Sequence, residues 1–149
     1  SAVDTHIGSA IDKRSLEQIM EQDILPFRSG IDAGAPSVLV SHNTVVSIDA
    51  SHPASLSPAV IDLLRSDLGF DGVIITDDLI MGAVTEYGSK GEIAIAAVMA
   101  GNDMLCTGDF VSQMPAVVNA VNEGLITEDQ IDASVLRILM MKLKLGIIS

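Results

Sequence analysis

Two groups of acidic residues stand out for the chemistry that they could perform. Asp4 and His6 lie two positions apart near the start of the chain, and Asp77 and Asp78 follow the apolar run 73–75. Side chains two apart in an extended segment share a face, so the Asp4 carboxylate can orient and charge the His6 imidazole. Such a histidine suits a proton donor. Asp77, at the end of an expected buried strand, suits a nucleophile at the mouth of a pocket.

Each of these residues also has a plainer interpretation. An aspartate after a strand is often a helix N-cap or a solvated loop residue, and His6 taken alone reads as a solvated loop histidine. Strand alternation places Asp77 and Asp78 on opposite faces, so only one of them can point into a pocket. The other carboxylate is expected to accept hydrogen bonds that hold the turn.

The composition describes one globular unit and excludes several classes of partner. The chain has 149 residues, of which 48% are hydrophobic and 19% charged, as expected for a well-cored domain. A net charge of -12 and the lack of a basic cluster argue against a nucleic-acid partner. Cys106 is the only cysteine, so neither a disulfide nor a multi-cysteine zinc site is available, and we expect a packed thiol.

Membrane insertion and cellular location are read from the ends and the apolar runs of the chain. No run of about 18 uninterrupted apolar residues occurs, so no membrane-spanning segment is expected. The first residues do not form a signal peptide, and the chain does not begin with Met. We therefore expect a piece of something longer. Its location, cytoplasmic or secreted and cell-wall associated, cannot be read from these residues.

Helix and strand signals alternate along the chain, as in βα units that build a parallel sheet. Capping boxes and glycine stops predict helices over 15–31, 57–69, 89–101, 111–122 and 127–146. Apolar runs predict strands at 37–41, 72–76 and 103–106. The helical spacing of the last helix predicts that four of its side chains lie in the core: Leu136, Leu139, Met140 and Leu143.

The expected strands begin about one βαβ unit apart, but three strands do not close a barrel. They would leave unpaired apolar edges, so further strands must come from elsewhere. The fold class expected is α/β.

The chain resembles glycoside hydrolase family 3, and within it the β-N-acetylglucosaminidase branch. The motifs that carry the resemblance run in order along nearly the whole chain: DTHIG at 4–8, PASLS at 53–57, LLR at 63–65, LGFDGVIITDDL at 68–79 and AGNDM at 100–104. Members of this branch have a (β/α)₈ TIM barrel, so the resemblance implies that residues 1–149 form the C-terminal part of one catalytic barrel. The three strands would then be the sixth, seventh and eighth, followed by a terminal helix.

The same resemblance implies that the N-terminal strands are missing from this sequence. They would be supplied by a separate chain or a missing segment. The upstream stretch Lys-His-Phe-Pro-Gly-His-Gly, with which the family helps bind the sugar, does not occur here. The resemblance therefore implies an enzyme that is active only when the complete barrel is present.

The reaction implied by the resemblance is retaining hydrolysis of terminal β-linked N-acetylglucosamine in cell-wall muropeptide or chitin-type saccharides, with a bacterial role in peptidoglycan recycling. Asp77 would be the nucleophile that forms a covalent glycosyl-aspartate. His6 would be the general acid/base and Asp4 would orient it, because in this branch a His-Asp dyad replaces the usual second carboxylate. The scheme needs neither a metal nor an organic cofactor. The preference for the acetamido sugar rests on the resemblance alone.

Two further residues and several other functions stay open. His42 and Asn43 follow the first expected strand, where they either bind substrate or serve packing. A β-N-acetylglucosaminide phosphorylase or a β-glucosidase of the same family is an alternative reaction. A non-catalytic barrel fragment or sugar-binding module is an alternative of another class.

Overall fold

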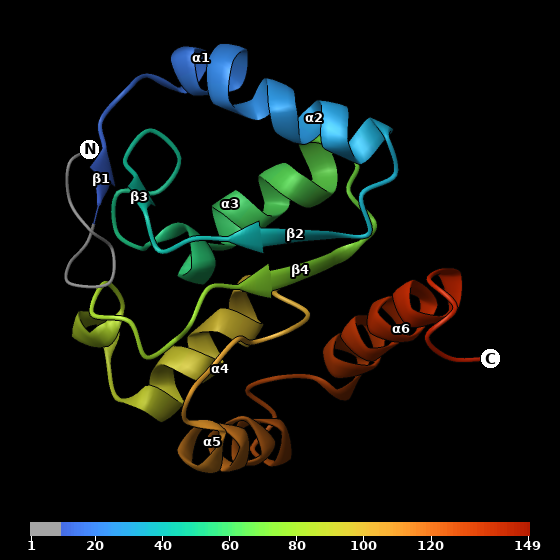
Figure 1. Ribbon diagram of the computed structural model, residues 1–149. Helices are drawn as coiled ribbons and strands as arrows, with labels where there is room; N and C mark the ends of the chain where they lie inside the picture. Colours follow the sequence, from blue (N-terminus) through green and yellow to red (C-terminus); the bar gives the residue numbers. More distant parts are fainter. Residues whose placement is uncertain (1–9) are drawn as a thin grey trace.

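The computed structural model describes residues 10–149, in which short strands alternate with helices (Figure 1). The strands are β1 (Ile11–Asp12), β2 (Ser37–Val40), β3 (Thr44–Val45) and β4 (Val73–Thr76). The α-helices are α1 (Leu16–Gln18), α2 (Ile24–Asp32), α3 (Pro58–Asp62), α4 (Lys90–Ala100), α5 (Phe110–Asn122) and α6 (Glu128–Lys144). π-helical turns η1 (Ile19–Asp23) and η3 (Leu63–Asp67) join α1 to α2 and extend α3, and 3₁₀ turns form η2 (Ala54–Leu56) and η4 (Thr85–Tyr87).

Local hydrogen bonds begin and end the helices where the sequence predicts. The Ser15 hydroxyl accepts from the Gln18 amide while the Gln18 side chain accepts from the Ser15 amide, and Ser89 with Glu92 forms the same reciprocal pair. These capping boxes satisfy amides that have no partner inside the helix. Gly101 ends α4 at φ 106°, a left-handed conformation that favours glycine.

The strands β2 and β4 pair in parallel at the centre of the molecule (Figure 1). Their register runs from Ser37 opposite Val73 to Val40 opposite Thr76. One more backbone bond follows, because the Asp77 amide donates to the Val40 carbonyl at 3.0 Å. Strands β1 and β3 form a separate parallel pair of two residues each. The two predicted central strands are confirmed.

The third predicted strand, at 103–106, is wrong in extent: within residues 10–149 it is a single parallel bridge between Ile75 and Met104. The Asp103 and Met104 amides both donate to the Ile74 carbonyl, and the Asp103 carboxylate accepts from the Ile74 amide at 2.8 Å. The Asp103 side chain thus accepts the hydrogen bond that a backbone carbonyl would accept in a longer strand. The structure shows the α/β class but not the number of strands expected for a partial barrel.

One face of the central sheet packs on helices and the other is open. Val38, Val40 and Ile74 point to the helical side, where they join a core with residues of α3, η3 and the following turn: Ile61, Leu64, Leu68 and Phe70. On the opposite face Leu39 is 54% exposed, and its register partner Ile75 is half-buried. Burial on both faces is the rule for parallel strands. Val73, on the same face at the start of β4, is 1% exposed, so the described residues leave this face uncovered only toward the carboxyl ends of the strands.

Two expectations about packing are wrong. The predicted core side chains of α6 are 45–60% exposed, and the Cys106 thiol, expected to be packed, is exposed. Figure 1 shows the reason for the first, because α6 stands away from the layers formed by the other helices. Helical periodicity identifies an apolar face but not whether a partner covers it. Within the described residues no helix has the length and apolar character needed to cross a membrane.

A buried carboxylate fastens β4 to the helices around it. The Asp103 side chain has no exposed surface and accepts from Arg65 at 2.6 Å and Arg137 at 3.0 Å. Arg65 also donates to the carbonyls of Phe70 and Gly72. A buried charge is tolerated when it is paired and hydrogen-bonded in this way. Asp103 thereby links the start of β4 to η3 and α6.

This network predicts a large cost for removing the charge. Asp103→Asn leaves two arginines facing a neutral amide, and should destabilise the protein by about 3 kcal/mol, as expected for a broken buried ion pair. Thermal and urea unfolding of the chain combined with the remaining strands of the expected barrel would measure this. Asp67→Asn, a change at an exposed carboxylate in η3, is the matched control. Equal effects of the two substitutions would contradict the assignment.

Candidate functional site

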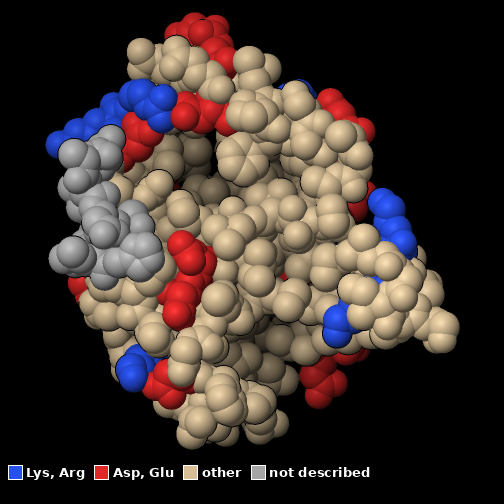
Figure 2. Space-filling view, viewed as in Figure 1, with Lys and Arg blue, Asp and Glu red and all other residues tan. Residues whose placement is uncertain are grey.

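Asp77 lies where β4 ends, on the open face of the sheet. Residues 73, 75 and 77 share one face of the strand, so Asp77 is displayed on the same side as Ile75 and Leu39. Its amide is fixed to the Val40 carbonyl, and its Oδ1 accepts from the Asp78 amide at 2.8 Å. Figure 2 shows acidic atoms in the middle of this view, next to a hollow. The backbone of Asp77 is thus held by β2, and its half-buried carboxylate is held by the amide of the next residue.

Asp78 turns the other way and holds the turn together. Its Oδ1 accepts from the amides of Ile80 and Gly108, both at 3.2 Å. The contact with Gly108 is tight, since a Cβ at that glycine would lie 2.8 Å from the end of the Ile80 side chain. The predicted role of Asp78, acceptance of hydrogen bonds that hold the turn, is confirmed.

His42 lies directly behind this turn. Its side chain is fully buried, with Nδ1 2.7 Å from the Ser55 hydroxyl and Nε2 2.9 Å from the Asp78 carbonyl oxygen. Because a carbonyl can only accept, Nε2 carries the hydrogen and donates. Both ring nitrogens are therefore engaged within the protein. This geometry matches the packing alternative for His42, with no ring nitrogen presented to a substrate.

Sequence reasoning missed the two polar residues that support His42. Ser55 is fully buried in η2, and its carbonyl accepts from the Asn102 side-chain amide at 2.8 Å. Asn102 is also buried, and its amide donates at 2.7 Å to the Ala97 carbonyl near the end of α4. Both residues fall inside motifs of the resemblance, which was the available signal. Their partners lie far away in the sequence, so spacing alone could not reveal their role.

Asn43 keeps its two interpretations. It is half-buried, and its carbonyl accepts from the Ala54 amide at 2.8 Å. Its side-chain oxygen is buried and, within the described part of the chain, has no hydrogen-bond partner. An unpaired buried acceptor is compatible with a bound ligand or ordered water. Substrate binding by Asn43 stays a prediction.

Asp49 organises the loop that leads to Ser55. Its carboxylate accepts from the Ser51 amide at 2.8 Å, the Ser57 hydroxyl at 2.8 Å and the His52 ring at 3.1 Å. Burial raises the pKa of Asp49, but these hydrogen bonds outweigh it and the net pKa is lowered. Asp49 therefore stays ionised near neutral pH and keeps the loop in one conformation.

Asp4 and His6 lie outside the described residues, so their contacts with Asp77 stay a prediction. The described part of the chain begins at Ala10. The Ala10 carbonyl accepts from the Thr44 amide at 2.8 Å, and β1 pairs with β3 in the loop that follows β2. The Arg14 side chain also bonds to Asp12, which holds the pKa of that carboxyl at about 2.

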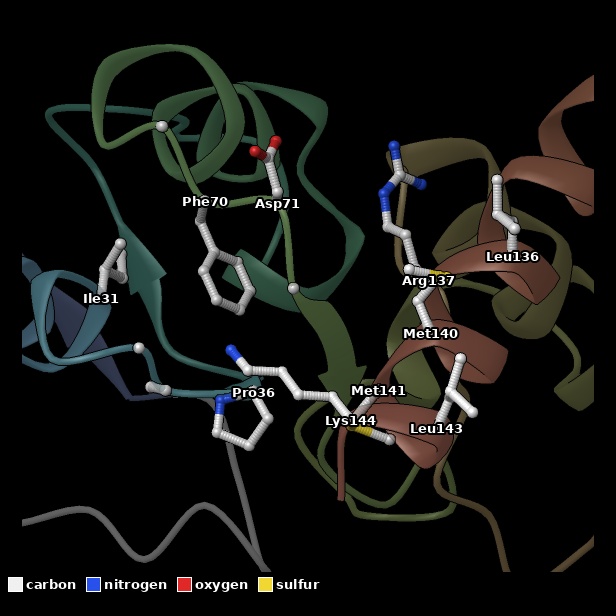
Figure 3. Close-up of a pocket in the computed structure, with 14 residues that line it drawn as sticks. Ile31, Pro36, Phe70, Asp71, Leu136, Arg137, Met140, Met141, Leu143 and Lys144 are labelled. Atoms are coloured by element: carbon white, nitrogen blue, oxygen red, sulfur yellow. The ribbon is translucent and has the colours of Figure 1, made fainter. Parts of the chain in front are cut away.

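A large pocket occurs at the opposite end of the strands (Figure 3). It lies between the segments that lead into β2 and β4, represented by Pro36 and Phe70, and the side of α6 that carries Met140. The Lys144 side chain reaches across it toward Gly34. This pocket is mainly apolar, and Asp77 is not among its lining residues. Its size therefore does not mark the chemical site.

The fold and the site define a class of protein. A carboxylate fixed at the carboxyl end of a parallel strand, beside loops rich in polar residues, is the arrangement in which α/β enzymes place a reacting group. Asp77 can act there as a nucleophile or as an acceptor of a proton. Among residues 10–149, no group of three or more His, Cys, Asp or Glu side chains is arranged to hold a metal ion.

The chain belongs to glycosyl hydrolase family 3. The model of the glycosyl hydrolase family 3 N terminal domain matches residues 1–141. A β-hexosaminidase of Stenotrophomonas maltophilia is 40% identical over 113 residues, which are 74% of this chain and 33% of the relative. The family expected from the sequence motifs is confirmed. The chain spans about a third of the length of such curated relatives.

Solved structures of the family share this fold. A family 3 β-N-acetylglucosaminidase from a Paenibacillus species superimposes with a TM-score of 0.88 at 34% identity, over 95% of this chain and 28% of that one. A β-glucoside phosphorylase gives a TM-score of 0.90 at 26% identity, over 97% of this chain and 28% of that one. The family thus includes neighbours named for two different reactions.

Proposed function

We propose that this chain supplies the nucleophile of a retaining β-N-acetylglucosaminidase that removes terminal β-linked N-acetylglucosamine. The observation that carries the proposal is Asp77 at the end of β4: its backbone amide donates to the Val40 carbonyl, and its carboxylate accepts from the Asp78 amide. The β-hexosaminidase and β-N-acetylglucosaminidase relatives support this choice of sugar. Cell-wall muropeptides and chitin-type saccharides are the proposed substrates.

In the proposed reaction the Asp77 carboxylate attacks the anomeric carbon as the bond to the leaving oxygen breaks. The protonated His6 imidazole gives its proton to that oxygen, so a neutral alcohol departs and a glycosyl-aspartate remains. Water then attacks the same carbon and gives a proton to His6, while the bond to Asp77 breaks. Two displacements at one carbon retain its configuration.

His6 suits the donor role because an imidazole titrates near neutral pH without deep burial. An ionised Asp4 beside it would stabilise the imidazolium and hold the ring in one orientation. The scheme uses neither a metal ion nor an organic cofactor.

We infer that the chain works as the C-terminal part of one barrel whose other strands lie outside residues 1–149. Leu39 on the open face of β2 is 54% exposed, and the apolar side chains of α6 are similarly exposed. Within the described residues β2 pairs only with β4, so its other edge is free. Free edges and exposed apolar faces favour coverage by further strands. The completed enzyme is this chain together with those strands.

Transfer of the sugar to phosphate is a second candidate, favoured by the similarity to a β-glucoside phosphorylase. A histidine donor serves both reactions, because phosphate would replace water in the second displacement. A β-glucosidase activity is the corresponding alternative for the sugar. Comparing turnover of N-acetylglucosaminides and glucosides, each with and without phosphate, separates these reactions.

Residues 1–149 expressed alone should not form an active enzyme. The open sheet face and the exposed side of α6 would drive association or incomplete folding. Sedimentation, urea unfolding and a glycosidase assay would measure this, with the completed enzyme as the control. A monomeric chain that unfolds cooperatively and is fully active would contradict the inference.

Asp77→Asn should lower the turnover number of the completed enzyme by about 10⁴-fold, because the amide keeps the shape but is not a nucleophile. A mechanism-based fluorosugar should label Asp77, as read by peptide mass spectrometry. Asp78→Asn is the matched control, since its oxygen can still accept from the Ile80 and Gly108 amides. Labelling of Asp78, or near-normal turnover of Asp77→Asn, would show the assignment wrong.

His6→Ala should be severely slow on natural disaccharides but should form the glycosyl-enzyme well from a substrate with a phenolic leaving group, which departs unaided. Hydrolysis of that intermediate should then be slow, because the same residue is needed as base. Added azide should restore turnover and yield a glycosyl azide of retained configuration.

The effect of Asp4→Asn provides the companion measurement. Its loss of activity should be milder than that of His6→Ala, and the upper limb of the pH profile should move to lower pH, because the imidazolium loses its carboxylate. Equal loss on good and poor leaving groups, without azide rescue, would remove His6 from the proton-transfer role.

A further inference from the structure

We propose that His42 is a positioning residue that sets the direction of the Asp77 carboxylate by holding the Asp78 carbonyl. The inference rests on the proposed function of Asp77 and adds a residue that does not touch the substrate. Three observations carry it: the place of His42 at the end of the paired strands, the fixed hydrogens of its ring, and the bonds that connect Asp78 to Asp77.

His42 stands where the backbone pairing of β2 and β4 stops. Val40 and Thr76 are register partners, so His42 and Asp78, each two residues further on, lie opposite one another. The last backbone bond of this pairing joins the Asp77 amide to the Val40 carbonyl. Beyond it the Leu79 amide donates to the Cys106 carbonyl in another loop. The His42 side chain thus replaces the bond that the diverging backbones no longer make.

The surroundings of His42 allow one arrangement of hydrogens for the neutral ring. Nε2 must donate because the Asp78 carbonyl can only accept, so Nδ1 accepts from the Ser55 hydroxyl at 2.7 Å. The Ser55 carbonyl in turn accepts from the side-chain amide of Asn102, which also donates to the Ala97 carbonyl. The links from His42 to Ser55, Asn102 and Ala97 are buried, the bond to Asp78 is partly buried, and Ala97 lies in α4. Within the described residues both hydrogens of the Asn102 side-chain amide are used, although its oxygen has no partner. A hydrogen-bonded network of this kind restricts the conformation of its members.

The Asp78 carbonyl is connected to the Asp77 carboxylate through the backbone of Asp78 itself. The Asp78 amide donates to Asp77 Oδ1 at 2.8 Å, its carbonyl is held by His42, and its side chain is held by Ile80 and Gly108. Rotation of this residue would carry the amide away from Asp77. His42 therefore restricts the nucleophile without contacting it.

A direct role of His42 in proton transfer conflicts with its contacts. The ring has no exposed surface, and both of its nitrogens already have partners inside the protein. A general acid must reach the leaving oxygen within hydrogen-bond distance. Positioning and acid/base roles predict different responses to the leaving group, so kinetics separates them.

Two substitutions in the completed enzyme separate the bond that His42 makes to the Asp78 carbonyl from the bond that it makes to Ser55. His42→Gln extends an amide donor toward the Asp78 carbonyl, whereas His42→Asn is too short for that bond and can only accept from Ser55. His42→Asn should lower the turnover number by about 100-fold with little change in KM, since small misplacements of a reacting group cost that much. His42→Gln should recover most of the loss. The loss should be equal for good and poor leaving groups.

An exposed residue outside the network supplies the control. Asp67 in η3 is exposed, so Asp67→Asn introduces the same amide away from the turn and should leave turnover unchanged. Hydrogen exchange gives a local measurement that needs no turnover. The Asp78 amide should exchange faster in His42→Asn, while the Ile74 amide, held by Asp103, should keep its rate.

The outcomes distinguish this inference from the proposed function. Normal turnover of Asp77→Asn would overturn the proposed nucleophile and this inference with it. An inactive Asp77→Asn beside a fully active His42→Asn with unchanged Asp78 exchange would overturn the positioning role alone. A selective loss on poor leaving groups in His42→Asn would assign proton transfer and also overturn it. If His42→Asn does not fold, Ser55→Ala replaces it; unchanged turnover and unchanged Asp78 exchange there would overturn the inference.

Discussion

The hydrogen bonds just beyond the paired part of β2 and β4 are the constraint on which the site depends. A parallel pair holds its residues through evenly spaced backbone bonds, and this support ends where the chains diverge. Here it ends at the bond from Asp77 to Val40, one residue before the turn that must keep a carboxylate in one direction. The protein continues the support with the His42 side chain, the Asp78 carboxylate and the neighbouring loop at Gly108. The turn formed by Asp77 and Asp78 is thereby held by two segments distant in sequence, one at 40–42 and one at Gly108.

Much of the secondary structure could be predicted from the sequence because its causes are local. The capping boxes at Ser15 and Ser89 act over three residues, so their sequence pattern nearly specifies the geometry. The predictions of a strand at 103–106 and of a buried face on α6 were wrong because both features depend on partners distant in sequence. Asp103 turns its carboxylate to the Ile74 amide, and α6 presents apolar side chains that the described residues leave uncovered. Periodicity records a tendency to be buried but does not supply the neighbour.

The candidate site likewise combines features that local sequence predicts with features that depend on distant partners. Asp77 and Asp78 could be separated because strand alternation gives them opposite faces, and the bonds of Asp78 agree with its expected role in the turn. His42 was left between binding and packing, since a residue after a strand fits either. The contribution of Ser55 and Asn102 was missed because Asn102 lies 47 residues from Ser55 along the chain. Asp4 and His6 remain predictions from the motif and the chemistry that it implies.

The open face of the sheet carries both uncovered apolar side chains and the Asp77 carboxylate. Leu39, Ile75 and Asp77 lie on the same side of the sheet, so any layer that covers the two apolar side chains also approaches the carboxylate. Because hydrophobic burial is the larger driving force, packing on Leu39 would determine how closely that layer sits. The Asp77 backbone is already held by the Val40 carbonyl, and its carboxylate accepts from the Asp78 amide, while the Asp78 carbonyl is bonded to the buried His42. In the proposed enzyme the direction of the Asp77 carboxylate would thus be set within this chain, whereas the walls around the sugar would come from the strands that complete the core.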